Sequence, residues 1–224
     1  MRFTVKLSSL LAMLLVGFSL LGGSGVGAQD MSSPEDSLDP SDLEGIQNGA
    51  ARYYTIDYSA MMENMGTPGA EMEMPSGLFA LGGAVLEFDN DDNAKSAFDT
   101  LKDDESFSGE LTGDNAEDWD SGLGDQNQGF KGTEDLEGSS MDTVFTMFQK
   151  DNYVYITLAA GTDVDVESAA KDFGNKLIDN DGSGAGEFKE DGTSTGGLWD
   201  KFPKADDEMV AELIPSDEVL YPND

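Results

Sequence analysis

The sequence predicts an α+β domain in which an antiparallel sheet of about four to six strands carries two helices on one face. Three observations predict this class. Two runs of β-branched and aromatic residues, 143–148 and 153–160, flank a short polar turn and indicate a β-hairpin. Two segments, beginning near residues 94 and 164, place apolar residues at helical spacing. Each helix follows a strand and an acidic turn, which favours a ferredoxin-like fold or a related pseudo-symmetric sandwich.

The start of the chain has the features of an export signal followed by a linker. Met1–Ala28 contains the basic residues Arg2 and Lys6, a short apolar run, and small residues that predict cleavage after Ala28. The alternative is a membrane anchor, but the apolar run is short and ends at two glycines. Residues 29–45 are polar and acidic without periodicity, which predicts a disordered tether. We therefore expect a secreted or cell-surface protein.

The α+β domain is expected over residues 46–180. Its first half contains two predicted strands, Ala51–Tyr58 and Leu78–Phe88, because apolar residues alternate there. Two adjacent glycines in the second strand indicate a β-bulge or the close approach of another backbone. An acidic turn can then cap a helix that ends near Lys102. The apolar stripe of this helix consists of Ala94, Ala97, Phe98 and Leu101.

The second half of the domain starts with an acidic, glycine-rich region, 103–140, where short strands are predicted near Trp119–Leu123 and Gln128–Gly132. The hairpin follows, with its turn at Lys150-Asp151-Asn152. Both faces of its second strand are apolar, which favours a central place in the sheet. The second helix is expected over Val164–Ile178. Its stripe consists of Val166, Ala169, Ala170, Phe173 and Leu177.

Residues 181–224 form a glycine-rich loop and then an extended tail. Spaced apolar pairs, which include Trp199 and Tyr221, predict that the tail packs on the domain rather than remaining disordered. One helical turn is expected near Asp206–Leu213.

The charge of the chain limits its partners. The 224 residues include 12 Lys and Arg and 46 Asp and Glu, which gives a net charge of −34. Removal of the signal peptide deletes two cations and no anion, which moves the net charge to −36. Such a chain repels nucleic acid and anionic lipid, and salt must screen its self-repulsion. The composition is typical of exported proteins of extreme halophiles. A single carboxylate is therefore a weak indication of function.

One loop matches a metal-binding pattern. Asp179–Glu190 has oxygen-bearing side chains at positions 1, 3 and 5, glycine at position 6 and glutamate at position 12, as in an EF-hand calcium loop. The predicted ligands are Asp179, Asp181, Ser183, Ala185 through its carbonyl, Glu187 through a water, and Glu190. Position 8 is a glycine and no amphipathic helix follows, which favours the alternative of a capped helix end and a solvated loop.

A methionine-rich segment provides a second candidate metal site. Thioethers are ligands for the soft ion Cu(I). The candidate copper ligands are Met61, Met62, Met65, Met72 and Met74. The alternative is that these side chains fill gaps in the core or form an apolar lid over a groove for a peptide or small molecule.

Several enzyme classes are excluded by composition. The chain has no His and no Cys, so Ser-His-Asp triads, imidazole bases and thiol chemistry are impossible. No phosphate-binding glycine loop occurs, and no carboxylate pair stands out among 46 acids. We expect a non-enzymatic binding or interaction domain at the cell surface, with a protein or small-molecule partner and no membrane span after signal cleavage. The alternatives are a calcium-binding domain or a soft-metal or small-ligand binder that uses the methionines.

Overall fold

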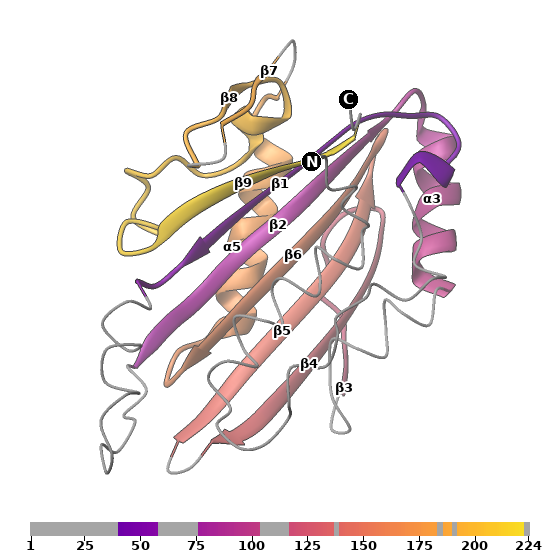
Figure 1. Ribbon diagram of the computed structural model, residues 1–224. Coiled ribbons are helices and arrows are strands. Elements are labelled where there is room, and N and C mark those ends of the chain that lie inside the picture. The colour runs from indigo at the N-terminus through magenta and orange to yellow at the C-terminus, as the bar shows by residue number, and fades with distance from the viewer. Residues whose placement is uncertain are drawn as a thin grey trace, which may run out of the picture.

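The computed structural model describes residues 40–57, 76–103, 117–136, 139–182, 186–189 and 192–221. These residues form an antiparallel sheet of seven strands in the order β3-β4-β5-β6-β2-β1-β9 (Figure 1). The strands are β1 (Ile46–Thr55), β2 (Gly77–Phe88), β3 (Glu117–Trp119), β4 (Gln126–Leu136), β5 (Ser139–Lys150), β6 (Tyr153–Thr162) and β9 (Ile214–Tyr221). The α+β class is confirmed, but the predicted number of strands was too low.

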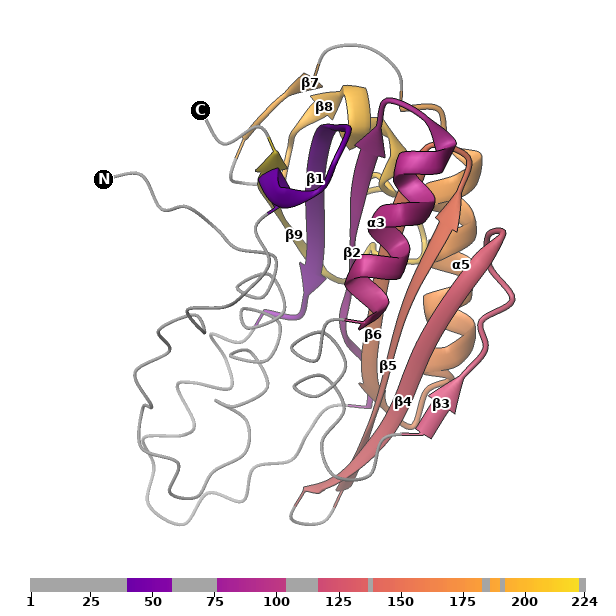
Figure 2. The same ribbon diagram turned by 90° about the vertical axis from the view of Figure 1, so that its right-hand side faces the viewer.

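The two helices cover opposite faces of the sheet. The helix α3 (Asp91–Asp103) packs on the face that carries Leu86 and Ile156, whereas α5 (Val166–Asp179) packs on the face that carries Val85 and Tyr155. In Figure 2 the strands β4 to β6 run between α3 and α5. The prediction that both helices share one face was wrong, because alternate residues of each strand belong to two separate cores.

This arrangement also excludes the ferredoxin-like and pseudo-symmetric sandwiches. The antiparallel neighbours β2 and β6 are each followed by a helix. A two-fold rotation that exchanged them would run perpendicular to the sheet and would leave both helices on one face. Because the helices lie on opposite faces, the similarity of the two halves ends with the succession of strand, turn and helix.

The local predictions for the helices agree with the structure. All four residues of the α3 stripe are buried, as are Val166, Ala170, Phe173 and Leu177 of α5, while Ala169 is half-buried. The helix α5 is capped by Asp165, whose carboxylate accepts a 2.9 Å hydrogen bond from the amide of Ser168. Periodicity and capping are local properties, so the sequence alone was sufficient here.

A glycine pair in β2 permits close packing rather than a bulge. The strand register is continuous across Gly82 and Gly83 with both neighbouring strands. A Cβ atom on Gly83 would lie 2.5 Å from the carbonyl oxygen of Ile156 and 2.8 Å from the ring of Phe173 on α5. The helix can therefore approach the sheet here because residue 83 has no side chain.

Residues 197–213 pack on the α5 side of the sheet, near β1 (Figure 1). A small two-stranded sheet, β7 (Gly186–Glu187) with β8 (Thr195–Gly196), leads into the short 3₁₀ helix η3 (Gly197–Lys201). Residues 204–213 form successive turns, and β9 then pairs with β1. At the other end, the 3₁₀ turn η1 (Pro40–Asp42) precedes the buried residue Leu43, which lies within the segment predicted as a tether.

Candidate functional site

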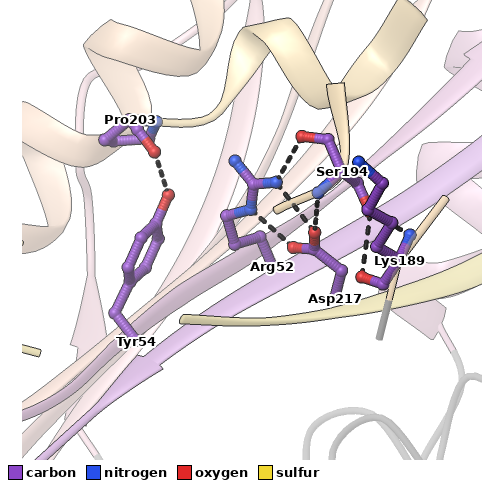
Figure 3. A network of polar contacts seen from close by, with 6 residues as sticks. All are labelled: Arg52, Tyr54, Lys189, Ser194, Pro203 and Asp217. Carbon is purple, nitrogen blue, oxygen red and sulfur yellow. Dashed lines mark hydrogen bonds and ion pairs between the residues drawn. The ribbon is translucent and has the colours of Figure 1, made fainter. Parts of the chain in front are cut away.

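A buried ion pair fastens the C-terminal segment to the sheet (Figure 3). The guanidinium of Arg52 in β1 donates from Nε to Oδ1 of Asp217 at 2.5 Å and from Nη2 to Oδ2 at 2.8 Å. The same Nη2 donates to the carbonyl of Ser194 at 2.8 Å, and the amide of Ser194 donates to Oδ2 of Asp217 at 2.9 Å. The two side chains are 5% and 0% exposed. This bidentate pair thus links β1, β9 and the segment before η3.

Aromatic side chains surround the same arginine. The rings of Trp199 and Phe202 each lie 5.8 Å from Cζ of Arg52. The hydroxyl of Tyr54, also in β1, donates to the carbonyl of Pro203 (Figure 3). Burial works against the charged guanidinium, yet the pKa of Arg52 is raised, foremost by its hydrogen bond to Asp217. With its charge matched and its Nε and Nη2 donors hydrogen-bonded, Arg52 has the properties of a structural link between these segments.

A cleft of about 540 Å³ lies where α5 begins, at the β3–β4–β5 end of the sheet. Valines from β5 and the start of α5 contribute apolar surface, and Val144 and Val166 are buried there. The polar lining residues are Glu117, Lys131, Thr133, Asp142, Thr143, Asp165 and Glu167. The lining is therefore mainly polar, and the cleft resembles the predominantly apolar sites of drug-sized ligands in its volume and not in its chemistry.

Two hydrogen bonds link polar side chains of this cleft in pairs. The ammonium of Lys131 in β4 lies 2.9 Å from Oε1 of Glu167 in α5, and this bond raises the pKa of Lys131. The hydroxyl of Thr133 donates to Oδ1 of Asp142 at 2.7 Å. The lining of the cleft therefore contains one ion pair, between β4 and α5, and one hydroxyl–carboxylate hydrogen bond, between β4 and β5.

A second cleft, of about 510 Å³, lies at the opposite end of α5. Its lining includes Asp181, Asp200, Asp206 and Asp207, and the ammonium of Lys176 lies 2.6 Å from Oδ2 of Asp207. Within the described part of the chain, no three carboxylates come close enough together to hold a metal ion. We therefore do not assign a metal to this cleft.

The predicted calcium ligands are only partly covered by the structure. Asp179, Asp181 and Glu187 are exposed, and Glu187 lies 3.7 Å from the ammonium of Lys189. The other three, Ser183, Ala185 and Glu190, lie outside the described residues. The calcium site stays a prediction.

The predicted copper ligands all lie outside the described residues, because Met61, Met62, Met65, Met72 and Met74 fall in the gap between residues 57 and 76. Soft-metal binding therefore also stays a prediction.

Sequence reasoning missed the residues of the cleft and of the buried pair. Lys131, Thr133, Asp142 and Glu167 carry no motif, since they meet only through the pairing of β4 with β5 and the packing of α5. Arg52 offered a signal, because it is the one arginine after the predicted signal peptide. An arginine in a predicted strand of so acidic a chain indicates a buried acidic partner.

No protein-family model, no curated protein and no solved structure matches this chain. In the part of the chain that the structure describes, none of the helices has the length and apolar character needed to cross a membrane.

Proposed function

We propose that the mature chain is an exported, non-enzymatic binding domain of the cell envelope, and that the cleft at the start of α5 receives its ligand. The cleft itself is the observation that carries this proposal. Its volume of about 540 Å³ falls within the range of roughly 300–1,000 Å³ that small-molecule sites occupy. Its mainly polar lining would hydrogen-bond a hydrophilic ligand and orient it in the cleft.

The geometry of the rim supports binding. The Lys131–Glu167 and Thr133–Asp142 contacts pair four side chains before any ligand arrives, and because the pairs are exposed this ordering is modest. Prior ordering lowers the entropy that binding costs. A ligand with several hydroxyl or amine groups would find both donors and acceptors here.

Composition supports export and argues against other partners. Met1–Ala28 has the pattern of a cleaved signal peptide. The net charge of −34 disfavours nucleic acid and anionic membranes as partners. The lack of His and Cys removes the commonest general base and the thiol nucleophile, which favours binding over catalysis.

The test is to isolate the protein from its native envelope or medium at its native salt concentration and to identify bound small molecules by native mass spectrometry. The molecule found is then titrated against two variants of the mature chain. Thr133→Trp fills the cleft and should weaken binding by about tenfold or more. Ser96→Trp places the same ring on the exposed side of α3 and should bind as the parent does.

Two results would contradict the proposal. One is a Thr133→Trp variant that binds as tightly as Ser96→Trp. The other is a parent protein that carries no small molecule and whose melting temperature no member of a broad metabolite library raises.

A further inference from the structure

At the end of α5 that faces away from the proposed ligand cleft, the side chain of Lys201 is buried and its ammonium is surrounded by oxygen atoms. Nζ lies 3.3 Å from the hydroxyl of Tyr155, 3.4 Å from the carbonyl of Leu177 and 3.2 Å from the carbonyl of Asn180. The residue is 5% exposed. An ammonium has three N–H donors, and three oxygens stand within reach. Lys201 thus binds two carbonyls at the C-terminal end of α5, which attracts positive charge.

The residues that follow α5 pack closely against the side chain and backbone of Lys201. A Cβ atom on Gly182 would lie 2.5 Å from Cγ of Lys201, so the aliphatic stem passes where residue 182 has no side chain. The side-chain amide of Asn180 donates to the carbonyl of Lys201 at 3.0 Å. The ring of Tyr153 lies 4.6 Å from Nζ, which adds a cation–π contact.

These contacts use the residues that begin the predicted calcium loop. In an EF-hand loop, alternate side chains from the first position turn inward to the ion. Here Asp179 and Asp181 are exposed, while Asn180 and Gly182 contact Lys201. The described start of the loop therefore surrounds an ammonium group.

We propose that the ammonium of Lys201 is the resident cation of this helix end, and that it holds the C-terminal segment on α5 without a metal ion. Lys201 belongs to η3, and its acceptors belong to β6, to α5 and to the residue after α5. Burial lowers the pKa of Lys201, and the fields of Asp181, Glu87 and Asp151 oppose that shift. The proposal is independent of the ligand cleft at the start of α5.

The test compares the mature parent chain with Lys201→Met and Lys204→Met, each with CaCl2 or with EGTA at constant ionic strength. Methionine keeps an apolar stem but removes the three donors. We expect Lys201→Met to lower the melting temperature by about 3–8 °C and to speed hydrogen exchange in residues 177–182 and 198–203. Lys204→Met changes an exposed lysine of the same segment and should match the parent.

The comparison of CaCl2 with EGTA tests whether Lys201 or a bound calcium ion stabilises this helix end. We expect the melting temperature of the parent to be the same in millimolar CaCl2 and in EGTA. A rise of several degrees with calcium that Asp179→Asn abolishes would overturn the proposal, as would Lys201→Met exchange rates equal to those of Lys204→Met. If Lys201→Met does not fold, the test uses the parent protein, in which NMR measures how fast the ammonium protons of Lys201 exchange with water. A slowly exchanging ammonium signal assigned to Lys201 supports the proposal, and a rapidly exchanging one contradicts it.

Discussion

Asp217 and Glu218 are neighbouring acids of β9 that point to opposite faces of the sheet and meet opposite surroundings. Asp217 accepts hydrogen bonds from Arg52 and from the amide of Ser194. Oε2 of Glu218 is buried and has no hydrogen-bond partner among the described residues. Burial raises the pKa of Glu218. Burial is also the main cause of the raised pKa of Tyr53, and the nearby charge of Glu218 raises that pKa further. One carboxylate therefore stabilises the fold, and its neighbour opposes it at neutral pH.

Replacing each acid by its amide tests this contrast. Asp217→Asn leaves the buried guanidinium of Arg52 without its counter-charge and should lower the free energy of unfolding by about 3–5 kcal/mol. Glu218→Gln removes a charge whose Oε2 has no hydrogen-bond partner among the described residues, and it should leave stability unchanged or higher at pH 7. Urea unfolding at fixed salt measures both. Equal losses in the two variants would refute the assignment.

The pH dependence of Glu218 has a definite sign. Because its pKa in the folded state lies above its ordinary value of 4.5, the folded protein prefers the protonated carboxyl. Its contribution to stability is full below pH 4.5 and is lost as pH rises through the raised value. Unfolding free energies of the parent and of Glu218→Gln should therefore diverge, in favour of the variant, as pH rises from 4 to 7. Parallel curves would contradict this.

At the scale of elements, the sequence predicted what periodicity controls. The stripes of α3 and α5 and the two-residue turn at Asp151 and Asn152 are local patterns, and the structure has each of them. The face that each helix covers was not predictable, because β2 and β6 are apolar on both sides. The glycine pair allowed two interpretations. The continuous strand register excludes a bulge, and the positions of the Ile156 carbonyl and the Phe173 ring show that close approach is the correct one.

The packing of α5 on β2 gives a prediction at this scale. Gly83→Ala would place a methyl group 2.5 Å from the carbonyl oxygen of Ile156, which belongs to the rigid sheet, and should cost about 1–3 kcal/mol of stability. Gly82→Ala meets the ring of Tyr53 at 2.8 Å, and this half-buried ring can shift. Thermal unfolding should therefore rank Gly83→Ala as clearly the less stable variant, and the reverse order would be inconsistent with this packing.

At the scale of the whole molecule, β9 shows why the sheet was underestimated. Ile214–Tyr221 includes Pro215 and two acids, a composition that does not predict a strand. Its partner β1 lies far away in the sequence, and the buried contact of Arg52 with Asp217 joins them. The cleft proposed to bind a ligand was unpredictable for the same reason, since its residues come from segments that only the tertiary fold brings together.

Net charge predicts how the whole molecule responds to salt. With 46 acids and 12 bases, most carboxylates lack a cation, and exposed ion pairs such as Lys95–Asp91 add little. The melting temperature should rise by about 10 °C or more between roughly 0.1 and 2 M KCl, because salt screens the repulsion. Chloride is chosen because sulfate also strengthens apolar burial. A melting temperature independent of KCl would contradict an adaptation to brine.

The central claim is that the cleft at the start of α5 binds the ligand. The most direct measurement is to map the co-purifying molecule on the ¹⁵N-labelled mature chain by NMR at high salt. We predict that the largest amide shift changes fall on Lys131, Thr133, Asp142 and Glu167, with little change near Asp200 and Asp207 at the other end of α5. Shift changes confined to that other end, or spread evenly over the acidic surface, would contradict the claim.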